Sequence, residues 1–126
     1  MEMFIVISPL NPDPMYKQIT DQIKDAIATG TLKPETKLPS IREMSKELNI
    51  SMITIKRAYA DLENEGLILT RSGMGSYIAD INKDTLREEK LTEIRAELNK
   101  IRETAAKFGI SAEDIIQIVN ESGEKS

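Results

Sequence analysis

Residues 38 to 78 read LPSIREMSKELNISMITIKRAYADLENEGLILTRSGMGSYI, and this stretch decides the fold. Ser40 and Glu43 have the spacing of a capping box, so a short helix is predicted to begin after Ser40 and to end near Asn49. A tight turn follows, and Ser51 can cap the next helix. The stretch therefore predicts two helices with only a few residues between them.

The second of these helices begins with a conflict between local and wider signals. Ile53, Thr54 and Ile55 are β-branched and by themselves favour a strand. The wider window keeps helical spacing as far as Leu62, with Gly66 closing the helix, and this longer signal outweighs three residues. The expected inward face consists of Ile55, Ala58, Tyr59 and Leu62.

After Gly66 the hydrophobic pattern becomes that of a hairpin. The segments LILT, residues 67 to 70, and SYIA, residues 76 to 79, are predicted strands. They are joined across RSGMG, whose two glycines suit a tight turn with positive φ. Another helix is predicted upstream of this stretch. The expected order is therefore three helices and then a hairpin.

Upstream, Asp13 and Pro14 predict the start of a helix over about residues 14 to 29, with the carboxylate as the cap and Gly30 as the end. Its apolar stripe is expected to comprise Tyr16, Ile19, Ile23, Ala26 and Ile27. The preceding run MFIVI is consistent with a strand or an extended arm. Whether residues 1 to 8 pair with the hairpin or extend freely is left open by the sequence.

Downstream, residues 82 to 107 predict one long helix, which ends at Gly109, and SAED then offers a second capping box for a short final helix. The apolar residues of the long helix alternate in steps of three and four: Leu91, Ile94, Leu98, Ile101, Ala105 and Phe108. The short helix carries Ile115, Ile116, Ile118 and Val119. Because the short helix cannot cover the whole stripe, we expect the stripe to form the seam of a dimer.

The fold class is therefore mainly α. Residues 1–80 are predicted to form a winged helix-turn-helix domain of three helices and a β-hairpin wing, and residues 81–126 a two-helix dimerisation tail. In a winged helix-turn-helix the third helix enters the DNA major groove, while the second crosses the backbone. The order of elements alone thus indicates double-stranded DNA as a partner.

Composition removes several other classes of function. The chain has no cysteine and no histidine, which excludes thiolate nucleophiles, disulfides and the usual soft metal ligands. We expect no cofactor, no metal and no enzymatic activity. The N-terminal residues lack the pattern of a signal peptide and no apolar run would span a membrane, so a cytoplasmic protein is expected.

The net charge of −4 at first argues against nucleic acid. Residues 33 to 57, however, carry six basic side chains against three acidic ones, and residues 51 to 60 contain no acid. Lys56 and Arg57 lie on the opposite side of the predicted helix from Ile55 and Tyr59. A local positive surface is therefore expected, with contacts to phosphates more than to bases.

Residues 38 to 78 also closely resemble the DNA-binding domain of the GntR family of bacterial transcription regulators. The matching residues are Leu38, Pro39, Ser40, Arg42, Ile50, Ser51, Thr54, Ile55, Ala58, Tyr59, Leu62, Glu63, Glu65, Gly66, Gly73 and Gly75. Only 47 residues follow Ala79, and a short two-helix tail resembles the YtrA subfamily, in which the tail is mainly a dimerisation device.

The resemblance implies DNA contacts at particular positions. Arg42 matches an arginine that contacts DNA from the start of the second helix, and Gly73 matches a wing position close to the minor groove. Thr54 and Lys56 match recognition-helix positions, with Ser40 and Ser51 near phosphates. We add Arg57 and Arg71 as further basic contacts.

One position departs from the family. Many relatives have arginine two residues before the threonine, whereas this chain has Met52, which cannot make a bidentate contact to guanine. Met52 and Ile53 have two open alternatives: they pack under the wing or turn, or they contact a thymine methyl group. The usual operator preference of the family is therefore not expected here.

The leading hypothesis is a homodimeric, sequence-specific DNA-binding regulator, expected to be a repressor that binds an inverted repeat. An effector-responsive sensor, with a small molecule at the tail or the dimer interface, is a second hypothesis, although the identity or existence of an effector is unknown. A protein-protein adaptor on the same scaffold is a third, because fold does not determine function.

Overall fold

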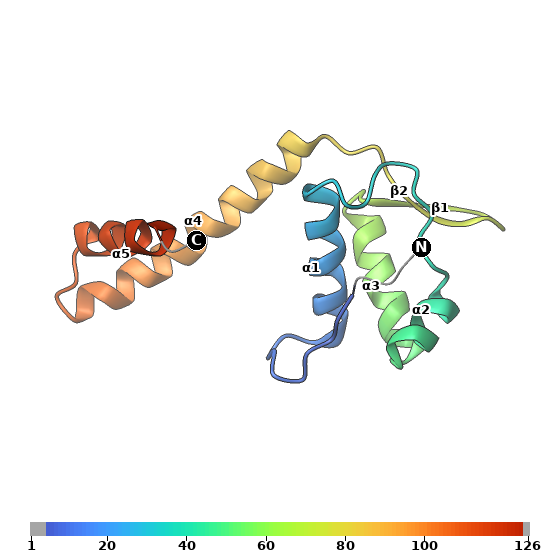
Figure 1. The fold of residues 1–126 in the computed structure, drawn as a ribbon, viewed down its shortest axis with the longest axis horizontal. Coiled ribbons are helices and arrows are strands. Elements are labelled where there is room, and N and C mark those ends of the chain that lie inside the picture. Colours follow the sequence, from blue (N-terminus) through green and yellow to red (C-terminus); the bar gives the residue numbers. More distant parts are fainter. Residues whose placement is uncertain (1–4, 125–126) are drawn as a thin grey trace. The chain divides into compact units, whose positions relative to one another are not determined.

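The computed structural model describes residues 5–124, and the fold is mainly helical, as predicted. Three helices, α1 (Met15–Ala28), α2 (Ile41–Leu48) and α3 (Met52–Asn64), precede the strands β1 (Ile68–Arg71) and β2 (Gly75–Ile78) (Figure 1). Two more helices follow, α4 (Lys83–Lys107) and α5 (Ala112–Glu124). The chain divides into two compact units, the first ending at Lys83 and the second beginning at Asp84.

In the first unit, α3 is the central element. It packs against α1, α2 and β1, and Figure 1 shows it beside α1. Every residue of its predicted inward face is buried, so the helical period was the right signal despite the β-branched start. The largest fully buried side chains of this core are Ile19, Ile23, Leu38, Met44, Ile55, Leu62, Ile68 and Ile78.

The turn between α2 and α3 is short because of its caps. Asn49 ends α2 in the left-handed conformation, with φ +53°, which asparagine tolerates better than most residues. Ser51 then caps α3 by accepting a hydrogen bond from the Thr54 N–H at 3.2 Å. The Tyr59 hydroxyl donates to the Pro39 carbonyl at 2.7 Å, and burial raises the pKa of Tyr59. This bond fixes α3 to the segment that leads into α2.

The strands form an antiparallel hairpin in which Ile68 pairs with Ile78 and Arg71 with Gly75. Each predicted strand is displaced by one residue from its observed bounds. The segment before α2 adds to the free edge of β2: Leu38 N–H donates to the Ser76 carbonyl, and Ile78 N–H to the Thr36 carbonyl, both at 2.9 Å. The wing is thereby anchored to the helical core.

The start of α1 differs from the prediction. Pro14 occupies the N-cap position and no side chain caps the helix, so the assignment of Asp13 as the cap was wrong. The Asp13 carboxylate instead lies 3.5 Å from the Lys17 ammonium group. In α2 only Met44 is buried, while Ile41 and Leu48 are half-buried.

The N-terminal segment rests on α1. Residues 1–4 of the predicted arm lie outside the described residues, but Ile5 is buried. The Gln22 side-chain amide exchanges two hydrogen bonds with the backbone of Val6, at 2.9 and 2.8 Å. Gln18 does the same with Ser8, at 3.0 and 3.3 Å. Residues 5–8 therefore neither pair with the wing nor extend freely.

The second unit is a helical hairpin. The helix α4 ends at Lys107, and Gly109 turns the chain with φ +72°. Ser111 and Asp114 form the predicted capping box at the start of α5: the Ser111 N–H donates to Asp114 Oδ2 at 2.9 Å, and the Asp114 N–H donates to Ser111 Oγ at 3.2 Å. Among the residues that the structure describes, none of the helices is long and apolar enough to cross a membrane.

Candidate nucleic-acid interface

The outward face of α3 carries the predicted basic residues. Lys56 and Arg57 are exposed, while Ile55 between Thr54 and Lys56 is fully buried. Thr54 is half-buried, and its Oγ1 lies 2.8 Å from Ser51 Oγ. Ser51 and Thr54 thus form a helix cap at the N-terminus of α3. Each of the two hydroxyl groups already has the other as its hydrogen-bond partner.

The first two residues of α3, Met52 and Ile53, are apolar and exposed. Met52 is 47% exposed and Ile53 is 82% exposed, so the alternative in which they pack under the wing or the turn is wrong for this chain. Their exposure beside Lys56 and Arg57 is consistent with contact to base edges such as the thymine methyl group.

Arg42 is exposed near the start of α2, where the capping box fixes the backbone. The Glu43 N–H donates to Ser40 Oγ at 3.0 Å, and the Ser40 N–H donates to the Glu43 carboxylate at 3.2 Å. These bonds to Ser40 hold the pKa of Glu43 below its ordinary value. Within the described residues Arg42 forms no ion pair or hydrogen bond, which leaves its guanidinium available to a ligand.

The wing arginine is held by protein groups. Arg71 forms an ion pair with Glu35 at 2.8 Å, and its guanidinium lies 4.5 Å from the centre of the Tyr77 ring. Glu35 has a left-handed backbone with φ +69°, an uncommon conformation for glutamate. The wing turn itself depends on Gly73, whose φ of +73° favours glycine even though a side chain would meet no atom there.

Lys37 is a basic wing residue that sequence reasoning did not place in the interface. It pairs with Tyr77 of β2, and its side chain lies against Gly75, where an added methyl group would approach Lys37 Cε to 3.1 Å. The sequence included Lys37 only in the count of six basic residues between positions 33 and 57. The edge pairing that brings it to the wing comes from tertiary structure.

We predict that Glu35→Gln tightens DNA binding by about two- to fivefold, because an exposed ion pair is worth roughly 0–1 kcal/mol and its loss frees Arg71 for phosphate. The measurement is fluorescence anisotropy with DNA that the unmodified protein selects. Glu65→Gln is the matched control, because it also removes a paired carboxylate, 3.0 Å from Lys24. Unchanged or weaker binding by Glu35→Gln would show that Arg71 does not reach DNA.

In the tail, the predicted seam is largely uncovered. Ile94, Leu98 and Ile101 are all more than a third exposed, and Leu91 is half-buried. Ala105 is buried within the α4–α5 unit, whereas Phe108 lies just after α4 and is exposed. The helix α5 adds Ile116, Ile118 and Val119, each exposed by more than half.

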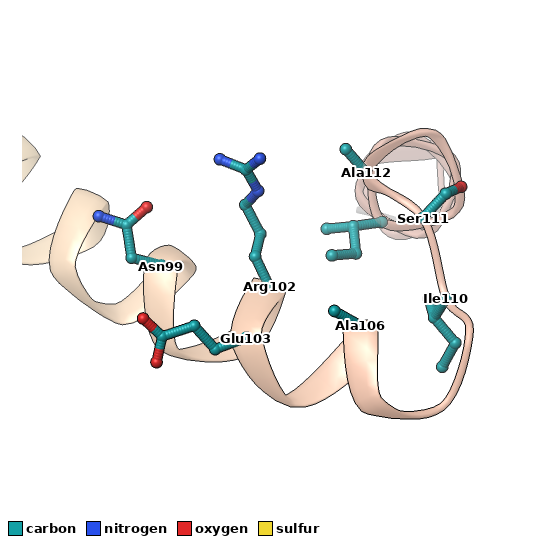
Figure 2. A pocket seen from close by; sticks show the side chains of 8 residues that line it. Asn99, Arg102, Glu103, Ala106, Ile110, Ser111 and Ala112 are labelled. Atoms are coloured by element: carbon teal, nitrogen blue, oxygen red, sulfur yellow. The ribbon is translucent and has the colours of Figure 1, made fainter.

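Two open grooves lie between α4 and α5. One, of about 550 Å³, is lined by polar as well as apolar residues, and Figure 2 shows Asn99, Arg102 and Glu103 projecting from α4 around it. The other, of about 420 Å³, is more apolar and is lined by Leu98, Arg102, Ala112, Ile115, Ile116, Val119 and Asn120. It therefore shares Leu98 with the predicted seam. No group of acidic residues suited to a metal ion occurs within residues 5–124.

Comparisons with known proteins agree with this geometry. The family model for bacterial regulatory proteins of the gntR family matches residues 15–78. The HTH-type transcriptional repressor YtrA of Bacillus subtilis is 37% identical over 117 residues, which cover 93% of this chain and 90% of that protein. The matched segment thus includes the tail as well as the helix-turn-helix.

Solved structures share this fold. A transcriptional antiterminator from Listeria monocytogenes EGD-e has a TM-score of 0.74 and 30% identity, covering 97% of this chain and 90% of that chain. AraR(DBD) in complex with operator ORX1 has a TM-score of 0.52 and 30% identity over 59% of this chain and 92% of that chain. The chain therefore belongs to the GntR family of bacterial regulatory proteins, as a DNA-binding transcriptional regulator with a YtrA-like tail.

Proposed function

We propose that this regulator is a cytoplasmic homodimer that represses transcription by occupying an inverted-repeat operator. The observation that carries the proposal is the exposed face of α3, with Lys56, Arg57, Met52 and Ile53 all open to solvent beside a buried core. A helix with this distribution fits the major groove, with basic side chains on phosphates and the two apolar side chains on bases. YtrA of Bacillus subtilis bears the name of a repressor, which supports this direction of control.

Each side chain has a separate role in the proposal. Arg42, available at the start of α2, contacts DNA where that helix crosses the backbone. The N-caps of α2 and α3 are Ser40 and Ser51. In the proposal the N-termini of both helices point towards DNA phosphates, because the positive end of a helix dipole attracts an anion. Thr54 fixes the cap of α3, and Gly73 allows the wing tip to approach the minor groove.

The dimer is proposed from the exposed apolar face of the tail. Leu91, Ile94, Leu98 and Ile101 supply the α4 side, with Phe108 at its end, and α5 adds three exposed aliphatic residues. Ala105 supports the α4–α5 packing from within its own unit. A twofold-related copy would cover this face in both protomers at once. The same copy would cover the more apolar groove, so we do not assign that groove to a small-molecule effector.

Two linked copies present two recognition helices to one DNA molecule. A twofold axis places them in successive major grooves about 34 Å apart, which requires an inverted repeat. Phosphate contacts would supply much of the affinity, so binding is expected to weaken steeply with salt. A titration of selected DNA that gave no specific complex even at low salt would overturn the proposal.

We predict that Met52→Arg shifts the preferred operator towards guanine at one position in each half-site. Arginine can make the bidentate contact to guanine O6 and N7 that methionine cannot make, and a good contact discriminates by about 1–3 kcal/mol. The measurement is selection from a random DNA pool, with the unmodified protein and Met52→Leu selected in parallel. An unchanged site for Met52→Arg would show that residue 52 does not contact bases.

A further inference from the structure

Tyr16, on α1 outside the helix-turn-helix, stacks on an interface residue. The Arg57 guanidinium carbon lies 3.7 Å from the centre of the Tyr16 ring, a close cation–π contact between α1 and α3. The sequence assigns Tyr16 to the apolar stripe of α1, but in the structure its side chain is only half-buried. Its hydroxyl forms no hydrogen bond within residues 5–124.

The stack leaves the charge of Arg57 available. Asp61 lies one turn further along α3, yet Arg57 forms no ion pair in the described part of the chain. Arg71 differs, because Glu35 already pairs with its charge at 2.8 Å. A guanidinium that stacks through its flat face keeps its N–H groups, which lie in the plane, free for a planar or tetrahedral anion.

We propose that Tyr16 is a positioning residue that holds Arg57 ready to bind a DNA backbone phosphate. This rests on the proposed DNA-binding function and extends the interface machinery to α1. A free arginine side chain must give up several rotatable bonds when it binds, and prior ordering lowers that cost. Tyrosine supplies the ordering surface without competing for the charge, which a carboxylate in its place would neutralise.

The test compares Tyr16→Leu with Tyr16→Phe in the full-length protein. Leucine keeps apolar packing against α3 but removes the ring, whereas phenylalanine keeps the ring and removes only the hydroxyl. With DNA selected by the unmodified protein, Tyr16→Leu is expected to bind about two- to fivefold more weakly per half-site, the fold-change of an exposed cation–π contact. Tyr16→Phe is expected to bind as the unmodified protein does.

A double-mutant cycle with Arg57→Ala separates positioning from structure. Once Arg57 is removed, Tyr16→Leu should weaken binding no further, and the salt dependence of Arg57→Ala and of the double variant should coincide. A Tyr16→Leu effect that persists in full on the Arg57→Ala background would overturn the inference, as would Tyr16→Phe binding as weakly as Tyr16→Leu. If the unmodified protein binds no DNA, the proposed function itself fails, which is a different result.

Discussion

Arg42→Ala is expected to remove most specific DNA binding. Arg42 has no protein partner within the described residues, so its loss costs the fold little while it deletes a contact of about 1–3 kcal/mol in each half-site. Across two half-sites this amounts to about 2–6 kcal/mol, so the expected loss of affinity is about 30-fold or more. Fluorescence anisotropy with selected DNA, at fixed salt, measures it.

The control for Arg42→Ala is Lys100→Ala. Lys100 is an exposed residue of α4, so this change removes the same charge from the tail and not from α2. Equal weakening by both variants would mean that only the overall charge matters. Full binding by Arg42→Ala would show that Arg42 does not contact DNA, whereas the adaptor hypothesis requires that the unmodified protein itself binds no DNA.

Ile101→Glu is expected to convert the dimer into monomers and to lower affinity for the full operator by about 100-fold or more, because linked half-sites gain that much from effective concentration. Ile101 is 50% exposed on α4, so glutamate there is solvated in the monomer but would be buried in an apolar seam. Sedimentation gives the mass, and the same anisotropy titration gives the affinity.

Ala96→Glu provides the matched control on the same helix. Ala96 is exposed and falls outside the stepped stripe that contains Ile94, Leu98 and Ile101. Ala96→Glu adds the same carboxylate as Ile101→Glu but places it outside the predicted seam. The proposed dimer is therefore expected to persist in this variant. A dimer that survives Ile101→Glu would contradict the assignment of the α4 stripe to the dimer interface.

Helical periodicity and capping patterns predicted most of the fold. The inward face of α3 follows from spacing alone, because a buried stripe must repeat with the period of the helix. Ser40 with Glu43, and Ser111 with Asp114, are contacts within one turn, so sequence spacing is enough to identify them. The cap at Asp13 failed because Pro14 took the N-cap position and Lys17 offered the carboxylate an ion pair.

The interface was less predictable because its finer features join residues far apart in the chain. Spacing cannot show that Arg57 stacks on Tyr16, that Glu35 pairs with Arg71, or that Lys37 joins the edge of β2. These contacts depend on how α1, α3 and the wing pack. Consequently the sequence identified the basic residues of the interface, but it did not show that Arg57 is stacked with its charge available or that Arg71 is paired with a carboxylate.

Sequence-specific recognition by two linked copies is tested most directly by selection of bound DNA from a random pool. We expect enrichment of an inverted repeat whose half-sites lie about one helical turn, roughly 10 base pairs, apart from centre to centre. Recovery of unrelated sequences at low salt, or of a single unpaired half-site, would contradict it.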